Sequence, residues 1–244
     1  MKVGEMVNLI IDGKKIEAEA GTTILAAARA NGIVIPTLCY HESIEPSGAC
    51  RLCVVEVAKG TRKRIVTSCI YLVEDGIVVD TKSERVLEAR RLVLELLMAR
   101  CPTSDVLQTM AKELGVKPQK RFTPDKDKGK CILCRLCVKT CEDVVGASAI
   151  GLSFRGKDKV VGPPFVEDST ACIGCGACVF ACPTGHIEMK IGKGGAERTI
   201  WGRTFKMVKC SVCGQYFAPE DQLRYISEKT GVPLENLEVC TNCR

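Results

Sequence analysis

The second half of the chain contains two cysteine runs with the same spacing, C-x2-C-x2-C-x3-C, and a proline follows the second run. Three thiolates two residues apart can bind one face of a [4Fe-4S] cluster, while the fourth, after a longer spacer, reaches a neighbouring cluster. The pattern therefore predicts two [4Fe-4S] clusters that exchange their fourth ligands and lie close together. One predicted ligand set is Cys131, Cys134, Cys137 and Cys182, and the other is Cys172, Cys175, Cys178 and Cys141. Two zinc sites are the weaker alternative, because the triple run has no ordinary zinc counterpart.

Four further cysteines near the amino terminus follow the spacing C-x10-C-x2-C-x15-C. This spacing departs from the plant-type ferredoxin pattern, so it is less specific than the two later runs. Small residues such as Gly48 and Ala49 let backbone N–H groups approach sulfur atoms, which stabilises a reduced and more negative cluster. We predict a [2Fe-2S] centre here, with a four-cysteine zinc site as the alternative. The predicted ligands are Cys39, Cys50, Cys53 and Cys69.

The carboxyl-terminal region carries a third kind of pattern, two C-x2-C knuckles separated by a long spacer. Two such knuckles can close a tetrahedral site around Zn²⁺, and the metal would stabilise a tail too small for a large core. We predict structural zinc, and a further iron-sulfur cluster is the alternative. The predicted ligands are Cys210, Cys213, Cys240 and Cys243.

Three other residues that could bind metal receive no ligand role. Cys101 follows an apolar helical segment, where a lone cysteine usually acts as a small hydrophobic side chain. His41 and His186 lie near predicted ligands, but each cluster already has four thiolates. At most these histidines adjust a cluster potential from outside the ligand set.

Composition narrows the class of protein. Charged residues such as Lys2 and Glu5 interrupt the first 21 residues, so we expect no secretory segment and a reducing cytoplasmic location. The 17 cysteines are an odd number, which fits metal-bound thiols better than paired disulfides. The formal charge of +6 is offset by cluster charge, and aromatic residues are only 5%, so nucleic-acid binding is not expected. No apolar stretch is long enough to span a membrane. No dinucleotide-binding fingerprint or nucleophile-base pair occurs, and we therefore expect no catalytic residue.

The first cysteine set is expected in a small module of strands around one helix, over residues 1–80. Val7–Ile11 and Lys14–Ala20 flank the turn Asp12-Gly13, and Thr22 or Thr23 can begin a short helix. Later strands around the cysteine loop complete a β-grasp [2Fe-2S] ferredoxin domain. A capping box at Thr81–Glu84 predicts the first of two connector helices over residues 81–122.

The remaining residues are expected to form two small modules. Lys117–Lys130 has the composition of a solvated linker into a dicluster ferredoxin-like domain at residues 123–196. A zinc-ribbon-like tail follows at residues 197–244, with a helix that begins at Pro219 and ends at Gly231. The predicted fold class is α+β.

These motifs resemble a known family. The segments "CRLCVKTCEDVVGASAIGLSFRG" and "CIGCGACVFACPTG", behind a four-cysteine β-grasp module, are similar to the amino-terminal part of the complex I large iron-sulfur subunit. They also resemble the diaphorase small subunit of NAD-linked nickel-iron hydrogenases and subunits of NAD-dependent formate dehydrogenases and electron-bifurcating complexes. The resemblance covers roughly Val7–Met189 and supports the [2Fe-2S] and crossed dicluster assignments. Where relatives bind one more [4Fe-4S] cluster through a histidine and three cysteines, "LLMARCPTSDVLQTMAKEL" retains only Cys101.

The resemblance implies an electron-transfer subunit between an NAD(H)-handling flavoprotein and another redox subunit. Its implied partners are an FMN-containing NADH-binding subunit, a small thioredoxin-like [2Fe-2S] subunit, and a terminal enzyme. That enzyme could be a hydrogenase, a formate dehydrogenase or a bifurcating transhydrogenase. Alternatives are the iron-sulfur subunit of a succinate dehydrogenase type complex, whose spacing fits less well, and a zinc-bearing interaction module.

Overall fold

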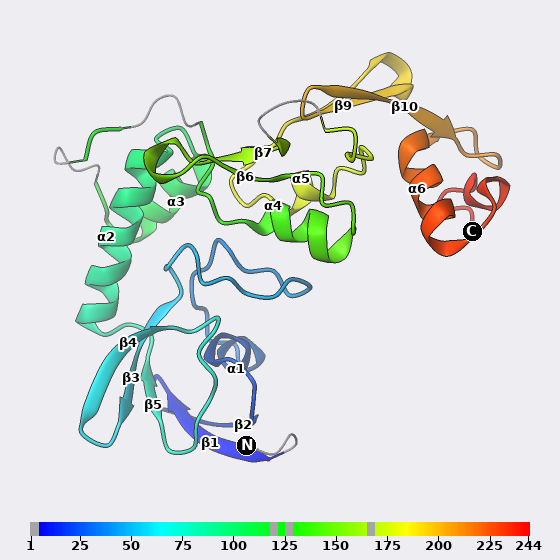
Figure 1. Cartoon of the computed structure of the whole chain (residues 1–244). Helices are drawn as coiled ribbons and strands as arrows, with labels where there is room; N and C mark the ends of the chain where they lie inside the picture. The colour runs from blue at the N-terminus through cyan, green and yellow to red at the C-terminus, as the bar shows by residue number, and fades with distance from the viewer. Residues whose placement is uncertain (1–4, 118–121, 125–128, 165–168) are drawn as a thin grey trace. The chain divides into compact units, whose positions relative to one another are not determined.

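The computed structural model describes residues 5–117, 122–124, 129–164 and 169–244. The chain divides into two compact units, Met1–Arg135 and Leu136–Arg244, which are described separately below (Figure 1). Much of the predicted linker Lys117–Lys130 lies outside the described residues. The α+β class is confirmed, since each unit contains both helices and strands.

The first unit is built on a five-stranded mixed sheet in the order β2-β1-β5-β3-β4. The pair β1 and β5 is parallel, and the other neighbours are antiparallel. The strands are β1 Met6–Ile11, β2 Lys14–Glu19, β3 Val54–Lys59, β4 Arg62–Thr67 and β5 Val78–Asp80. The predicted hairpin turn is confirmed, because Asp12 and Gly13 both have positive φ, as a tight two-residue hairpin turn requires.

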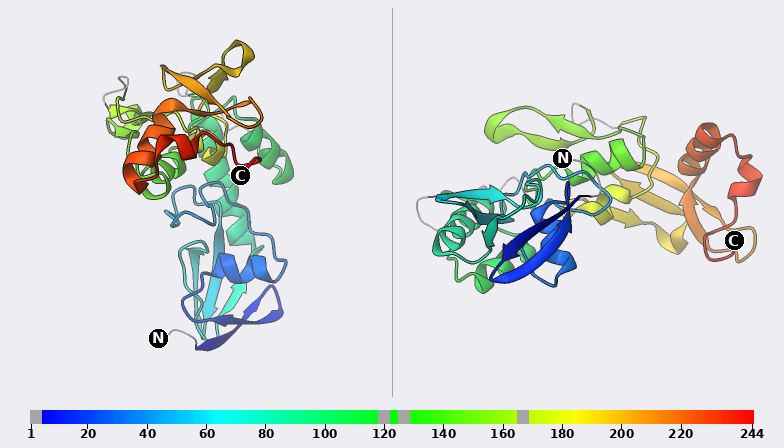
Figure 2. Two further views of the ribbon diagram at one scale, coloured as in Figure 1. Left: turned by 90° about the vertical axis from the view of Figure 1, so that its right-hand side faces the viewer. Right: turned by 90° about the horizontal axis from the view of Figure 1, so that it is seen from below.

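One helix covers this sheet. The helix α1, Ile24–Ala30, begins after Thr23, whose Oγ1 accepts a hydrogen bond from the N–H of Ala26 at 3.2 Å. The helix lies against the sheet (Figures 1 and 2). Its apolar side chains share one buried core with those of the strands, for example Leu25 with Leu9 and Val55. This arrangement is the one that the predicted β-grasp module requires.

Two helices follow the sheet: α2 Glu84–Arg100 and α3 Asp105–Glu113. The predicted capping box at Thr81–Glu84 is wrong, because Ser83 is the residue that caps α2, and its side chain accepts a hydrogen bond from Val86 N–H. Thr81 is instead buried, and its N–H and Oγ1 donate to the carboxylate of Asp12 at 2.7 and 2.6 Å. The competing partner Asp12 lies 69 residues away, so local spacing could not reveal it.

The second unit opens with short elements around the cysteine runs. These are α4 Leu136–Lys139, the π-helical turn η2 Thr140–Val144, the hairpin β6 Gly151–Ser153 and β7 Val160–Gly162, and α5 Ala177–Ala181. Two single 3₁₀ turns, η3 Gly156–Asp158 and η5 Lys193–Gly195, connect strands.

A four-stranded sheet in the order β11-β10-β9-β8 forms the rest of this unit. Its strands are β8 Met189–Ile191, β9 Glu197–Ile200, β10 Arg203–Lys209 and β11 Tyr216–Pro219. The sheet contains strands on both sides of residue 196, and the proposed domain boundary there stays a prediction. The helix α6, Glu220–Thr230, starts after Pro219 as expected, ends at Gly231 and lies against β10 and β11 (Figure 2). A last turn, η6 Leu234–Leu237, precedes the second knuckle.

Among the described residues, no helix is both long and apolar enough to cross a membrane.

Candidate cluster and metal sites

The four amino-terminal cysteines are brought together in the first unit, and each is at most 4% exposed. Cys39 and Cys50 lie in the loop between α1 and β3, Cys53 directly precedes β3, and Cys69 follows β4. The side chains form two contacting pairs, Cys39 with Cys50 and Cys53 with Cys69. Since a [2Fe-2S] centre takes two thiolates on each iron, two neighbouring pairs suit its geometry.

Backbone N–H groups point at these sulfurs. The N–H of Cys50 donates to Cys39 Sγ at 3.2 Å, and the loop turns tightly because Gly48 and Arg51 have positive φ. A Cβ atom on Gly48 would come within 3.2 Å of the Ile70 side chain, so a larger residue would push the loop outward. Gly48 therefore helps to bring backbone N–H groups close to the cysteine sulfurs, as the sequence predicts.

One thiol in each pair ionises readily. The Cys39 thiol donates to Cys50 and lowers the pKa of Cys50 to about 6, and the Cys69 thiol likewise lowers the pKa of Cys53 to about 7. The same hydrogen bonds raise the pKa values of Cys39 and Cys69. Because the thiolate is the form that binds iron, both pairs are prepared for metal binding.

A buried arginine supports this loop, and the sequence interpretation missed it. Arg90 of α2 is 4% exposed, and it donates from Nε to the carbonyl oxygen of Leu52 at 3.0 Å and from Nη2 to that of Val54 at 2.7 Å. These two carbonyls flank Cys53. Burial lowers the pKa of Arg90. Its position was visible in the sequence, since Arg90 falls four residues after Val86 and four before Leu94, on the buried face of the helix.

The ligand set Cys131, Cys134, Cys137 and Cys182 is divided between the two units, and it stays a prediction. Within the first unit, the carbonyl oxygen of Cys131 accepts hydrogen bonds from Arg100 Nε and from Cys101 Sγ, both at 3.1 Å. Cys101, expected to be a small core residue, is fully buried and also holds the backbone of a predicted ligand.

Within the second unit, backbone groups hold Cys182. Burial disfavours its thiolate, but N–H groups of Thr184 and His186 donate to Sγ and lower the pKa of Cys182. The His186 N–H lies 3.3 Å from that sulfur. The other histidine, His41, lies in the loop of the first site, where its Nδ1 accepts a hydrogen bond from the N–H of Ser43.

The second predicted cluster set lies around one pocket. Cys141 reaches it from η2, Cys172 and Cys175 from the loop before α5, and Cys178 from the first turn of α5. The other lining residues are mostly apolar, including Val145, Ala147, Ala149, Ile150 and Ile200. Four thiols at one apolar pocket are a donor set that fits a [4Fe-4S] cluster.

The apolar surroundings raise the pKa values of three of these thiols and pack tightly against the loop that carries them. Burial raises the pKa values of Cys172 and Cys175, and raises that of Cys178 to about 11. Gly174 has φ of 69°, and a Cβ atom there would meet the Phe205 ring at 2.6 Å. The β10 strand therefore packs directly against the cysteine loop.

Two arginines of the β9–β10 hairpin hold this loop from the same side. Arg198 Nη1 donates to the carbonyl oxygens of Gly174 and Cys175 at 3.0 and 3.2 Å. Arg203 Nη1 donates to the carbonyl of Cys172 at 2.8 Å. No pattern in the sequence pointed to either role, because the hairpin follows the cysteine run and contacts it only in three dimensions.

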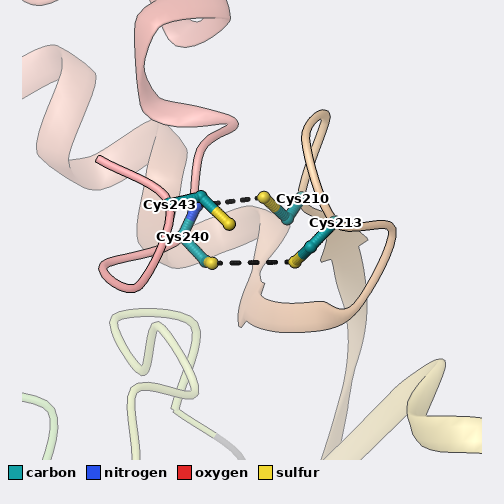
Figure 3. Close-up of side chains that lie close together, drawn as sticks. All are labelled: Cys210, Cys213, Cys240 and Cys243. Carbon is teal, nitrogen blue, oxygen red and sulfur yellow. Dashed lines mark hydrogen bonds between the residues drawn. The ribbon is translucent and has the colours of Figure 1, made fainter.

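The four tail cysteines face one another across two knuckles (Figure 3). Their sulfurs all lie within 4.8 Å of one another, and Cys213 Sγ is 3.8 Å from Cys240 Sγ. A tetrahedral zinc ion with bonds of about 2.3 Å separates its sulfurs by about 3.8 Å. Backbone N–H groups of Cys240 and Cys213 lower the pKa of Cys210 to about 6, which favours its thiolate.

No other group of three or more such ligands lies this close together in the part of the chain that the structure describes. A cluster separates its thiolates further than a single ion does, because several irons and bridging sulfides lie between them. Within their own units, the amino-terminal set and the set of Cys141, Cys172, Cys175 and Cys178 are thus not arranged as closely as the tail cysteines.

Comparison with known families identifies both cluster modules. Residues 4–84 match the family described as a 2Fe-2S iron-sulfur cluster binding domain. Residues 165–187 match the family described as a 4Fe-4S binding domain. The second match contains the run from Cys172 to Cys182.

Curated relatives are parts of NAD(P)-linked enzymes. The chain is 38% identical over 211 residues to the NADPH-Fe(3+) oxidoreductase subunit alpha of Geobacter sulfurreducens, which covers 76% of this chain and 24% of the relative. It is 38% identical over 211 residues to an NADP-reducing hydrogenase subunit of Solidesulfovibrio fructosivorans, and this match covers 75% of this chain and 36% of the relative. It is 33% identical over 208 residues to the mitochondrial NADH-ubiquinone oxidoreductase 78 kDa subunit of Neurospora crassa, and this match covers 75% of this chain and 28% of the relative. The chain thus spans 24–36% of the length of these relatives.

A solved structure is similar over more of its length. A chain of the NAD⁺-reducing [NiFe]-hydrogenase in the H₂-reduced state superimposes with a TM-score of 0.56 at 31% identity. The match covers 64% of this chain and 74% of that chain.

Proposed function

Because this chain belongs to the family of iron-sulfur subunits of NAD(P)-linked oxidoreductases and hydrogenases, we propose that it relays electrons from a flavoprotein subunit that handles NAD(H) to another redox subunit. The terminal enzyme would be a hydrogenase, a formate dehydrogenase or a bifurcating transhydrogenase. The direct partners would be an FMN-containing subunit and a small thioredoxin-like [2Fe-2S] subunit in the cytoplasm. The chain itself would transfer electrons without forming or breaking substrate bonds.

One observation carries this proposal: Cys141, from the first cysteine run, lies at the pocket of Cys172, Cys175 and Cys178 from the second run. Cys137 is four residues before Cys141, and a helical rise of about 1.5 Å per residue separates their backbones by roughly 6 Å along the axis. If Cys137 binds the other cluster, the two clusters are near neighbours. Short steps between neighbouring clusters are what an electron relay needs.

The chain's residues hold, bury and shield the three proposed clusters, which supply reversible one-electron transfer when bound. In the amino-terminal module, two thiol pairs would each bind one iron, and Arg90 fixes the loop between them. In the second unit, Cys141, Cys172, Cys175 and Cys178 would bind a cluster at the apolar pocket that they line. Cys131, Cys134, Cys137 and Cys182 would bind the remaining cluster.

For the tail we propose zinc bound by Cys210, Cys213, Cys240 and Cys243, with a structural role. The sulfur separation supports a single ion, and the local apolar core is small, with Ala218, Leu223 and Leu237 as its buried residues. A bound ion would supply stability that so small a core lacks.

Metal analysis of the anaerobically purified full chain tests the ligand sets. We expect about ten irons with matching acid-labile sulfide, from one [2Fe-2S] and two [4Fe-4S] clusters, and about one zinc. An iron content near two would contradict the dicluster assignment, and zinc at every site would favour an interaction module.

The relay role is tested in the complex with its flavoprotein. Cys50→Ser should abolish electron transfer from NADH to the terminal acceptor while NADH still reduces the flavin. Undiminished transfer to the acceptor would show that the [2Fe-2S] site is not on the path.

A further inference from the structure

The hairpin between β9 and β10 contains the chain's single tryptophan in an unusual backbone conformation. Ile200 pairs with Arg203, so Trp201 and Gly202 form a two-residue turn, with φ of 53° and 80°. Such turns favour asparagine or glycine, because bulky residues resist the left-handed conformation. Strain of this kind persists where the surrounding structure holds the residue in place, often for function.

The indole ring of Trp201 lines the pocket that Cys141, Cys172, Cys175 and Cys178 share. Its Nε1 is buried and has no hydrogen-bond partner among the described residues. A buried N–H without a partner is rare in native structures, because it gives up its bond to water and gains none.

A second buried donor without a partner lies on the same hairpin. Arg198 uses Nη1 to hold the carbonyls of Gly174 and Cys175, yet its Nε is buried and, within the described residues, unpartnered. Trp201 lines the four-thiol pocket, and Arg198 contacts the backbone of Cys175, which also lines it. Both buried N–H groups would gain an acceptor from a cluster sulfur within their reach.

We propose that Trp201 Nε1 and Arg198 Nε donate hydrogen bonds to sulfur atoms of the cluster bound by Cys141, Cys172, Cys175 and Cys178, and thereby raise its reduction potential. This inference rests on the proposed function, because it requires a cluster in this pocket. Reduction adds negative charge to the cluster sulfurs, so N–H donors and a guanidinium stabilise the reduced state.

The single tryptophan permits a test that changes one atom. Biosynthetic incorporation of benzothienylalanine replaces the indole N–H of Trp201 by sulfur and leaves the ring shape nearly unchanged. In a redox titration of the full chain followed by electron paramagnetic resonance, we expect one [4Fe-4S] potential to fall. The expected fall corresponds to a roughly tenfold weaker preference for the reduced state, about 59 mV for one electron. The other two potentials should stay constant.

The matched control is 5-fluorotryptophan, which keeps the N–H and should not lower any potential. Trp201→Phe should reproduce the effect of benzothienylalanine, and Arg198→Gln should lower the same potential. An independent readout is the single indole ¹H–¹⁵N resonance, which should shift or broaden when this cluster is reduced. Unchanged potentials in the benzothienyl protein, at full iron content, would overturn the inference.

Failure of the proposed function gives a different result. Iron analysis of the unsubstituted chain would then show fewer than two [4Fe-4S] clusters, before any tryptophan analogue is used. With both clusters present, a constant potential contradicts only the role of Trp201 and Arg198.

Discussion

Arg203 and Asp221 form an ion pair of 2.7 Å that joins the predicted cluster loop to the tail helix. The Nη2 of Arg203 donates to Asp221 in the first turn of α6, while its Nη1 donates to the Cys172 carbonyl. One guanidinium thus contacts both a proposed ligand of a [4Fe-4S] cluster and the helix that lies, in the sequence, between the two knuckles of the proposed zinc site. The stability of the tail and that of the cluster loop are therefore coupled.

Asp221→Asn should weaken this link. Both side chains are about one-third exposed, so we expect a loss of about 0.5–1 kcal/mol and faster zinc release to a chelator. The control is Glu220→Gln on the same helix turn, which removes a more exposed pair with Arg224. Equal rates of zinc release from both variants would show that the link to Arg203 has no special role.

Cys141→Ala should remove one ligand from the second cluster only. The iron content should fall from about ten towards six, or a three-iron signal should appear in electron paramagnetic resonance, because the pocket keeps three thiols. The [2Fe-2S] signal should be unchanged. If the variant retains ten irons with unaltered spectra, Cys141 is not a ligand.

Gly174→Ala should disrupt the same cluster by a steric effect. A Cβ atom would lie 2.6 Å from the Phe205 ring, and the glycine has φ of 69°. We expect a destabilisation of about 2–4 kcal/mol and loss of iron, from overpacking added to backbone strain. The control is Gly194→Ala, which has the same φ of 69° and no atom within 4 Å of the new Cβ. That variant should lose only about 1 kcal/mol and no iron, and similar losses in both would exclude the steric explanation.

Arg90→Leu should destabilise the amino-terminal module. The substitution leaves the buried carbonyls of Leu52 and Val54 without their donor, at a cost of about 2–4 kcal/mol. Loss of the [2Fe-2S] absorption in denaturant measures this effect. The neighbouring exposed residue Arg91 provides the control, and Arg91→Leu should shift the midpoint little. A small shift for Arg90→Leu would show that water replaces the guanidinium.

Cys240→Ser should abolish zinc binding while the iron content stays near ten. Cobalt substituted into the unaltered protein should give the absorption of a tetrahedral four-thiolate site, since the sulfurs fit a single ion. X-ray absorption at the zinc and iron edges checks the assignment. Iron with bridging sulfide at these cysteines would contradict it and extend the electron path into the tail.

The sequence allowed accurate prediction where the determining contacts are local. The hairpin turn at Asp12-Gly13, the cap at Thr23 and the end of α6 at Gly231 each depend on residues only a few positions apart. Cysteine spacing also predicted that Cys141 lies beside the later run, and Cys141 does line one pocket with Cys172, Cys175 and Cys178. Its role as a ligand of that cluster stays a prediction.

Other features depend on partners distant in the chain. Thr81 looked like a helix cap, but Asp12 in the turn between β1 and β2 accepts its hydrogen bonds. Arg198, Trp201 and Arg203 contact a loop more than twenty residues earlier, and no spacing rule connects a cysteine run with a later hairpin. Arg90 is the intermediate case, since its place on the apolar face of α2 was visible although its two carbonyl partners were not.

The strand order of the first sheet has a consequence for the sequence of events during synthesis. β5 lies between β1 and β3, yet it is the last of the five strands to leave the ribosome. The hairpins β1–β2 and β3–β4 can each form early from local contacts, but they have no sheet pairing with each other until Val78–Asp80 arrives. All four amino-terminal cysteines precede that strand. A nascent chain therefore exposes its predicted [2Fe-2S] ligands before the sheet is complete, and we expect a cluster to be inserted most easily before β5 pairs with β1 and β3.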